Sequence, residues 1–251
     1  MNCERPKISI VTVVKNGACF VEQTILSVGA QTFTNREYIV IDGGSTDGTL
    51  DIIRKHGDSI DSWVSEPDRG LYDAMNKGIR RARGDWIHLL NADDRYVDRF
   101  TLEAVAERLA DPGRFYYFSM IQKRGRVEKI YRWKYRKWQL WYSAYLPHPT
   151  MFVSREAYRS IGGYDTRFPI AADHDMILRL IGGGVRPVFV DRPVTSMRIG
   201  GRSSLDYHRT FQEFRDVTVK NGLNPFLANA LCRFKIAKYG LLCRGRHPRH
   251  V

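Results

Sequence analysis

The sequence is poor in cysteine and contains no long apolar run, and each absence excludes a class of protein. Its 251 residues hold four cysteines, Cys3, Cys19, Cys232 and Cys243, with no CxxC pair among them. This spacing argues against a zinc site or a disulfide framework and fits a reducing compartment. No apolar run approaches the roughly 20 residues that span a bilayer. The N-terminus also lacks the apolar block of a signal peptide, so we expect a cytoplasmic protein.

Acidic residues are scarce relative to basic ones. The chain has 27 Asp and Glu against 40 Lys and Arg, which gives a formal net charge of +13. Such a balance predicts a polyanionic partner, which is nucleic acid, an anionic membrane face or a phosphorylated substrate. Solubility by charge is the plainer interpretation. The charge alone does not choose among these.

Strand-like and helical patterns alternate over the first 100 residues. Apolar, β-branched runs predict strands at 7–14, 36–42, 61–68 and 85–90, and helical spacing predicts helices at 20–31, 49–56 and 71–83. This alternation predicts an α/β fold with a mixed, mostly parallel sheet flanked by helices. Beyond it we expect a helix at 101–109, two strands around the turn at 123–126, a strand at 185–190 and mostly helix from 205.

Polar side chains follow three of these predicted strands. Asn16, Asp42 and Asp93 each lie just past a strand, where ligands bind in parallel sheets. Asp93 is followed directly by Asp94, and two such close carboxylates raise each other's pKa unless a cation lies between them. The pair is therefore either a solvated loop or a ligand of Mg²⁺ or Mn²⁺, which prefer oxygen ligands.

Five segments, taken in order, resemble the family 2 glycosyltransferases with a GT-A fold. They read SIVTVVKN, VIDGGSTDGT, SEPDRGLYDAMNKGI, GDWIHLLNADD and HPTMFVSREAYRSIGGYDTRFPIAADHDMILRL, and the resemblance covers roughly residues 6–200. The second and third look like the branch that adds sugars in bacterial polysaccharide and glycolipid assembly. The resemblance implies a nucleotide-sugar donor, a divalent metal and inversion at the anomeric carbon.

The same resemblance implies the residues of a donor site. Asp42 would bind the base, most often uracil. Asn91 to Asp93 stands at the DxD position with Asn91 in place of the usual first acid, so the metal, Mn²⁺ or Mg²⁺, would fall on Asp93 together with Asp94. The nucleotide-sugar pocket as a whole would be lined by Thr12, Asn16, Asp42, Asp68, Asp73, Asn76, Asn91 and Asp93.

The acceptor side is implied by the segment AADHD, residues 171–175. Asp173 stands where the family has its catalytic base and would take the proton from the acceptor hydroxyl. It also precedes a helical pattern, so an N-cap is the structural alternative, and Asp175 is the second candidate base. For contacts with the acceptor or the diphosphate we consider His148, Arg202 and His208, each of which has a plain structural interpretation as well.

Two stretches combine basic residues with apolar ones. Residues 129–146 pack three Trp and four Tyr among five Lys or Arg, and a predicted helix at 223–242 is followed by Arg244, Arg246 and Arg249. The apolar face of this helix is predicted to hold Leu227, Ala230, Leu231, Phe234, Leu241 and Leu242.

Given the family, these stretches predict an anionic membrane surface and a glycan or polyprenyl-diphosphate-linked acceptor. We expect a glycosyltransferase domain at 1–215 and a basic helical extension at 216–251, peripheral to the inner face of the membrane.

Two other functions fit parts of the sequence. A nucleic-acid-binding protein would explain the charge and the interleaved aromatics, but it predicts no role for Asp93 or Asp173. A metal-dependent nucleotidyltransferase would also use aspartate-bound metal. A nucleotidyltransferase would need a glycine-rich phosphate-binding loop in the first strand-to-helix turn, and the segment VVKNGACF at this place is not rich in glycine. We therefore expect a sugar nucleotide rather than nucleic acid as the partner.

Overall fold

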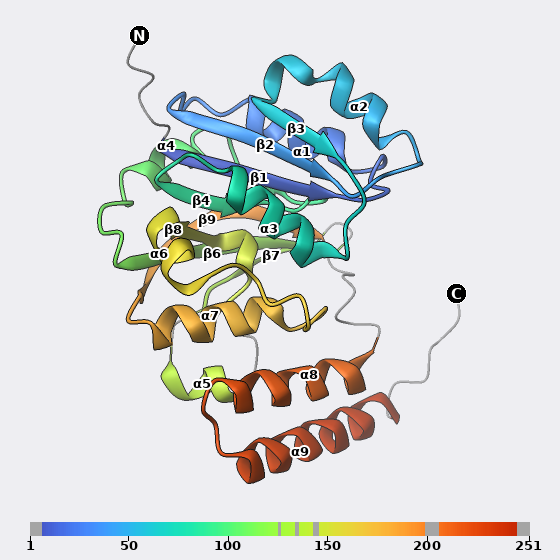
Figure 1. The fold of residues 1–251 in the computed structure, drawn as a ribbon, viewed down its shortest axis with the longest axis vertical. Coiled ribbons are helices and arrows are strands. Elements are labelled where there is room, and N and C mark those ends of the chain that lie inside the picture. The colour runs from blue at the N-terminus through green and yellow to red at the C-terminus, as the bar shows by residue number, and fades with distance from the viewer. Residues whose placement is uncertain (1–6, 125–126, 134–135, 143–145, 199–205, 245–251) are drawn as a thin grey trace.

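A mixed β-sheet crosses the middle of the protein, with helices on both faces, in the computed structural model (Figure 1). The structure describes residues 7–124, 127–133, 136–142, 146–198 and 206–244. The strand order is β3-β2-β1-β4-β8-β6-β9-β5, and β7 pairs with β6. The expected α/β class, with a mixed sheet flanked by helices, is confirmed.

The first half of the sheet is parallel. Val14 is in register with Asp42, and Asp42 with Ser65, so the carboxyl ends of three strands meet at one edge. The strands β1 and β2 are rich in β-branched residues and almost entirely buried, as inner parallel strands require, whereas the edge strand β3 is partly exposed. The strands are β1 (Ile8–Val14), β2 (Arg36–Asp42), β3 (Ser62–Ser65) and β4 (Trp86–Leu89).

The second half of the sheet contains the antiparallel strand pairs. The strand β8 is antiparallel to both β4 and β6, which returns β6 and β9 to the direction of β1. The strands β6 and β9 therefore end at the same edge as the first ones, whereas β5, β7 and β8 run the other way. The bounds of the later strands are β5 (Arg95–Tyr96), β6 (Arg114–Arg124), β7 (Val127–Tyr131), β8 (Met151–Ser154) and β9 (Arg186–Arg198).

Alternate side chains of β1 enter two separate cores. Val11 and Val13 pack in the cluster that holds α3 (Leu71–Arg81), α6 (Arg155–Ile161) and α7 (Ala172–Gly182). Ile8 and Ile10 pack on the opposite face. That second core is covered by α1 (Val21–Gly29), α2 (Thr49–Lys55) and α4 (Thr101–Ala106).

The remaining helices lie beyond α7. They are α5 (Lys137–Tyr142), α8 (Tyr207–Lys220) and α9 (Pro225–Arg244), and α8 and α9 pack side by side at one end of the molecule (Figure 1). The domain boundary expected between residues 215 and 216 falls inside α8, which also contacts α7. Within the described ranges, every helix is too short or too polar to cross a membrane.

The helices α1 to α4 each end earlier than the sequence predicts. The third helix stops at Arg81 because Ala82 is extended, and the N–H groups of Arg83 and Gly84 turn to the buried carboxylate of Glu37 instead. The helix expected at 101–109 ends at Ala106.

Candidate active site

Asn16 joins the loop after β1 to the turn after β2. Its backbone N–H donates to the Ser45 hydroxyl at 2.7 Å, and its Oδ1 accepts from the Thr46 N–H at 2.9 Å. Its φ of 52° lies in the left-handed region, which asparagine tolerates better than most side chains. The two loops therefore form one rim at the carboxyl edge of the sheet.

Asp42 organises the turn at that rim. Its carboxylate is fully buried. One oxygen, Oδ2, accepts from the N–H groups of Gly44 and Ser45, both at 3.0 Å, and from the Ser65 hydroxyl at 2.6 Å, and Oδ1 accepts from the Ser45 hydroxyl. The carboxylate thus shapes the loop that faces the site.

Asp68 reaches over Gly43 toward the same edge. A Cβ placed on Gly43 would lie 1.9 Å from Asp68 Oδ2, so any side chain at position 43 would displace this carboxylate. The other oxygen, Oδ1, accepts from the Gly70 N–H at 2.9 Å. The glycine therefore makes room for a carboxylate that comes from a different loop.

Asp73 and Asn76, both on α3, bond to the protein itself. The N–H of Arg69 donates to Asp73 at 3.1 Å and holds the pKa of this carboxyl below its usual range, although burial opposes the shift. The Asn76 amide pairs with both backbone groups of Tyr164, at 2.8 and 2.7 Å. Asn76 thereby ties α3 to the loop after α6.

The expected metal loop follows β4. Asp93 is exposed, whereas Asp94 is 1% exposed. Asn91 bridges Asp94 and His148: its Nδ2 donates to Asp94 Oδ2 at 3.0 Å, and its Oδ1 accepts from His148 Nε2 at 3.1 Å. Burial lowers the pKa of His148 to about 4, so this imidazole is neutral at pH 7.

The two carboxylates fit a bound cation. Asp94 Oδ1 is buried without a hydrogen-bond partner in the described part of the chain, and such an orphaned oxygen is unusual. Burial and the charge of Asp93 raise the pKa of Asp94 to about 8.

Among the described residues no cluster of three or more His, Cys, Asp or Glu could hold a metal ion. Asp93 and Asp94 share a small cavity of about 20 Å³ that is also lined by Gln23, Thr24, Arg95, Lys123 and Ser196.

Asp173 lies in the first turn of α7. It is not the N-cap, which is Ala171, and its Oδ1 accepts from the neighbouring His174 N–H at 2.7 Å. Burial raises the pKa of Asp173 to about 6, while the hydrogen bond from the His174 N–H and the nearby Tyr72 side chain limit the rise. A carboxyl with this pKa can accept a proton near neutral pH and release it again.

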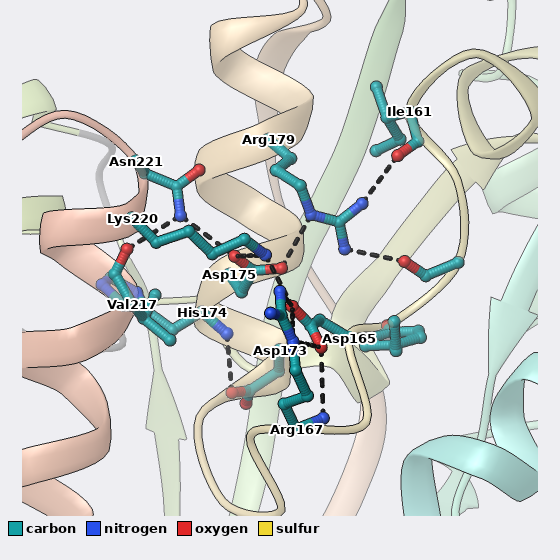
Figure 2. A network of polar contacts seen from close by, with 12 residues as sticks. Ile161, Asp165, Arg167, Asp173, His174, Asp175, Arg179, Val217, Lys220 and Asn221 are labelled. Atoms are coloured by element: carbon teal, nitrogen blue, oxygen red, sulfur yellow. Dashed lines mark hydrogen bonds and ion pairs between the residues drawn. The ribbon is translucent and has the colours of Figure 1, made fainter.

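Asp175 has a different environment from Asp173 (Figure 2). It is completely buried and accepts from Arg179 Nε at 2.7 Å, Lys220 Nζ at 2.8 Å and Asn221 Nδ2 at 3.0 Å. Burial alone would raise the pKa of Asp175, but these donors hold it below its usual value. Asp175 therefore ties α7 to α8, whereas Asp173 makes no ion pair in the described part of the chain and has a raised pKa.

The remaining predicted residues are placed as follows. Thr12 is fully buried, and its hydroxyl accepts from the Tyr38 phenol at 3.1 Å. His208 is exposed on the first turn of α8, with its ring against Tyr207. Arg202 lies outside the described residues.

Sequence reasoning missed two side chains near Asp173. Tyr72 of α3 donates to the Ile170 carbonyl at 3.0 Å, and Glu213 of α8 accepts from the N–H groups of Ile170 and Ala171. In the sequence, Tyr72 resembles any apolar residue on an inner helix face. Glu213 resembles any charged residue of a surface helix, so neither carries a signal.

Comparison with known sequences gives one family. The model described as Glycosyl transferase family 2 matches residues 9–165. A Mycobacterium tuberculosis protein named an uncharacterized glycosyltransferase is 36% identical over 180 residues, which are 69% of this chain and 68% of the relative. A PGL/p-HBAD biosynthesis glycosyltransferase of Mycobacterium bovis is 30% identical over 181 residues, 69% of each chain.

Solved structures share the fold. S. aureus TarS 1–349 in complex with UDP-GlcNAc matches with a TM-score of 0.70 and 17% identity, over 90% of this chain and 70% of that one. In a longer TarS structure the match spans 42% of that chain. The Pyrobaculum calidifontis mannosyltransferase PcManGT, in complex with GDP-Man and Mn²⁺, matches with a TM-score of 0.67 and 20% identity, over 97% and 80%. The expected GT-A fold is thus confirmed.

Proposed function

This chain belongs to glycosyl transferase family 2, and from that membership we propose that it is an inverting enzyme that uses a nucleotide-diphosphate sugar. The donor is a UDP-sugar, and the acceptor is a hydroxyl of a glycan or lipid-linked glycan in cell-surface assembly. Three similar proteins support this choice. They are the relative named for PGL/p-HBAD biosynthesis, TarS in complex with UDP-GlcNAc, and PcManGT in complex with GDP-Man and Mn²⁺.

The observation that carries the proposal is the Asp173 carboxyl. It takes the proton of the acceptor hydroxyl while the oxygen of that hydroxyl attacks the anomeric carbon. The bond from the anomeric carbon to the diphosphate breaks in the same step, and the nucleoside diphosphate leaves. A single displacement of this kind inverts the anomeric configuration. The pKa of about 6 leaves Asp173 mostly ionised at pH 7, as this role requires.

The donor lies along the carboxyl edge of the first strands. Asp42 and Asn16 shape the rim for the nucleotide, and Asp68 faces it from the loop before α3. The exposed Asp93 and the buried Asp94, whose Oδ1 has no hydrogen-bond partner in the described residues, would hold the Mn²⁺ or Mg²⁺. The metal, when bound, stabilises the negative charge that grows on the departing diphosphate.

The acceptor is presented at an anionic membrane surface, which α9 contacts. Its inner face buries Ala228 and Cys232 against α8, and Lys235 lies 4.5 Å from the centre of the Tyr142 ring of α5. The opposite face leaves apolar side chains in solvent: Phe226 is 87% exposed, Leu227 51% and Phe234 56%, and Ala230 is exposed as well.

Basic residues lie beside this outward apolar face. Arg233 and Lys238 are exposed on α9, and each basic residue near an anionic leaflet contributes about 1 kcal/mol. Of the face predicted from the sequence, Leu231 is half-buried instead. The side chains of Leu241, Leu242 and Arg244, and all of Arg246 and Arg249, lie outside the described residues.

The chemical test starts with a panel of UDP-, GDP- and dTDP-sugars, with and without Mn²⁺, scored by thermal shift, because a ligand that binds only the native state raises its stability. Turnover of the selected donor is then compared for the intact enzyme, Asp173→Asn and Asp175→Asn. We expect Asp173→Asn to lose about 10²–10⁴-fold in rate with donor affinity retained. If turnover is lost in Asp175→Asn but not in Asp173→Asn, and Asp175→Asn keeps normal donor binding and stability, the base is Asp175.

The membrane test is co-sedimentation with phosphatidylglycerol vesicles, and phosphatidylcholine vesicles serve as the reference. The double variant Phe226→Ser/Phe234→Ser should lose sedimentation, and the matched variant Leu26→Ser, which changes a 54% exposed leucine on α1, should keep it. High salt should weaken binding, because charges are screened within about 10 Å at 0.1 M ionic strength. Membrane docking is contradicted if the intact protein does not sediment with the vesicles. It is also contradicted if light scattering shows that the intact protein is a dimer and the double variant a monomer.

A further inference from the structure

The N-cap residue of α7, Ala171, makes no side-chain cap hydrogen bond at the turn that carries Asp173. Within that turn, Asp173 Oδ1 accepts from the N–H of its neighbour His174. The helix begins where the Asp175 N–H donates to the Ala171 carbonyl at 3.0 Å. Another element must therefore hold the segment that leads into the turn.

That element is α8, through Glu213. Its Oε2 accepts from the Ile170 N–H at 2.8 Å and from the Ala171 N–H at 3.1 Å. Glu213 is 8% exposed, and its Oε1 accepts from Arg209 Nε at 3.2 Å. A buried carboxylate with these partners has a defined position, because each of its oxygens is bonded.

The same peptide unit is held from the opposite side by α3. The Tyr72 hydroxyl donates to the Ile170 carbonyl at 3.0 Å, and this carbonyl and the Ala171 N–H belong to one peptide group. Tyr72 is itself buried and stacks on Tyr164, with ring centroids 5.3 Å apart. The peptide is thus bonded at its oxygen to α3 and at its nitrogen to α8, two residues before Asp173.

We propose that Glu213 is a positioning residue for the transfer reaction, which acts by holding the Ile170–Ala171 peptide against Tyr72 and so orienting Asp173 toward the acceptor. The inference rests on the proposed role of Asp173 as the base. It extends the functional machinery to α8, which lies beyond the matched family residues 9–165. Glu213 acts through the helix start and does not touch the substrate.

The experiment compares three substitutions on the same helix in the full-length protein. Glu213→Ala removes the acceptor, Glu213→Gln keeps an oxygen at the same reach, and Asp216→Asn changes an exposed acid that bonds Arg215. Each variant is assayed with the sugar nucleotide selected by the panel and with water as the acceptor. Rates are expressed per nucleotide-binding site, so that unfolded protein does not count. Hydrogen exchange of residues 168–176 reports directly on the helix start.

We expect Glu213→Ala to lose about 10- to 100-fold in kcat, because a small misplacement of a reacting group costs that much, while KM for the donor stays unchanged. Exchange at 168–176 should rise in this variant. Glu213→Gln and Asp216→Asn should stay close to the intact enzyme in both measurements.

A Glu213→Ala enzyme with normal kcat per site, or one that loses kcat without faster exchange at 168–176, overturns the inference. Asp173→Asn serves as the reference for the proposed function. If Asp173→Asn is inactive while Glu213→Ala is not, only the inference fails. If Asp173→Asn turns over normally, the proposed function itself is wrong.

Discussion

The Nε2–H of His148 donates to Oδ1 of Asn91 at 3.1 Å, and this contact ties the segment before β8 to the loop after β4 that is proposed to bind the metal. Asn91 in turn donates to Asp94. An amide is suited to this position because it accepts from a neutral histidine on one side and donates to a carboxylate on the other. Asn91, which stands where the family usually has an acid, therefore has a hydrogen-bond partner at both its amide nitrogen and its amide oxygen.

Asn91→Asp should destabilise the metal-free protein. The change removes the donor to Asp94 and places a second carboxylate beside a carboxyl whose pKa is raised to about 8, so at pH 9 the two like charges repel. Thermal unfolding should show a lower midpoint without metal and a larger rise on addition of Mn²⁺ than the intact protein shows. Equal midpoints without metal would contradict the bridge.

Asp93→Ala should abolish transfer and the Mn²⁺-dependent part of nucleotide binding while the fold is retained, because Asp93 is exposed and makes no contact that the core requires. Isothermal titration of UDP with Mn²⁺ and with EDTA separates the two parts of binding. Asp98→Ala, which changes another exposed acid that also follows β4 in the sequence, is the control. Unchanged turnover in Asp93→Ala would remove it from the site.

Tyr72→Phe should move the acid limb of the pH–rate profile upward. The Tyr72 side chain lowers the pKa of Asp173, so its removal raises that pKa above about 6. A base works in its ionised form, so the variant should lose most activity below pH 7 and recover as the pH rises. Tyr158→Phe changes a buried tyrosine that contacts Tyr164 and is the matched control. If the acid limb of the pH–rate profile does not shift in Tyr72→Phe, then Tyr72 does not lower the pKa of Asp173.

Gly43→Ala should weaken nucleotide binding more than it weakens the fold. The new Cβ would occupy the place of Asp68 Oδ2, and a carboxylate at the end of a flexible side chain can swing away at little cost in stability. Gly57→Ala, where no atom lies within 4 Å of the added Cβ, is the control. The double variant Gly43→Ala/Asp68→Ala should bind no worse than Asp68→Ala, because effects that share one contact are not additive.

Lys220→Met should lower the free energy of unfolding by about 1–3 kcal/mol at pH 7, the typical cost of a lost charged hydrogen bond. Lys220 Nζ lies 2.8 Å from carboxylate oxygens of both Asp165 and Asp175. Both carboxyls have lowered pKa values in the fold, for Asp165 chiefly through Arg167 and for Asp175 against the effect of burial.

The contribution of Lys220 is therefore fully present above the ordinary aspartate value of 3.8 and is lost as the pH falls below it. Urea unfolding at pH 7, 5 and 3 should show the difference between the two proteins narrowing only at the last pH. Lys55→Met, which breaks an exposed pair with Glu22, should cost much less at every pH.

The parallel half of the sheet could be predicted because each strand is a short apolar run followed by turn residues. In Lys7–Val14 five of the eight positions are apolar and β-branched, and all of β1 is buried. The place of β8 could not be predicted in this way, because it lies between β4 and β6 through pairings with segments distant in the sequence. Local patterns contain no record of such neighbours.

The acidic pair shows the same limit at the level of side chains. Asp93 and Asp94 are equivalent in the sequence, yet one is exposed and the other buried. The difference arises partly from Thr24 of α1, whose hydroxyl donates to the Asp94 carbonyl at 2.6 Å from 70 residues away. The sequence located the loop, and only the tertiary contact shows which carboxylate turns inward.

The bridge that Lys220 makes between Asp165 and Asp175 constrains how relatives can be recombined. The matched family region ends at residue 165, and it is tempting to graft a new acceptor half at that point. A joint there would give Asp165 an ion-pair partner from another parent in place of Lys220, and it would also replace α7, the helix that carries Asp173 and Asp175. Grafts that carry residues 163–221 as a single block keep Asn76 paired with a backbone amide and leave every ion pair of Asp175 within one parent.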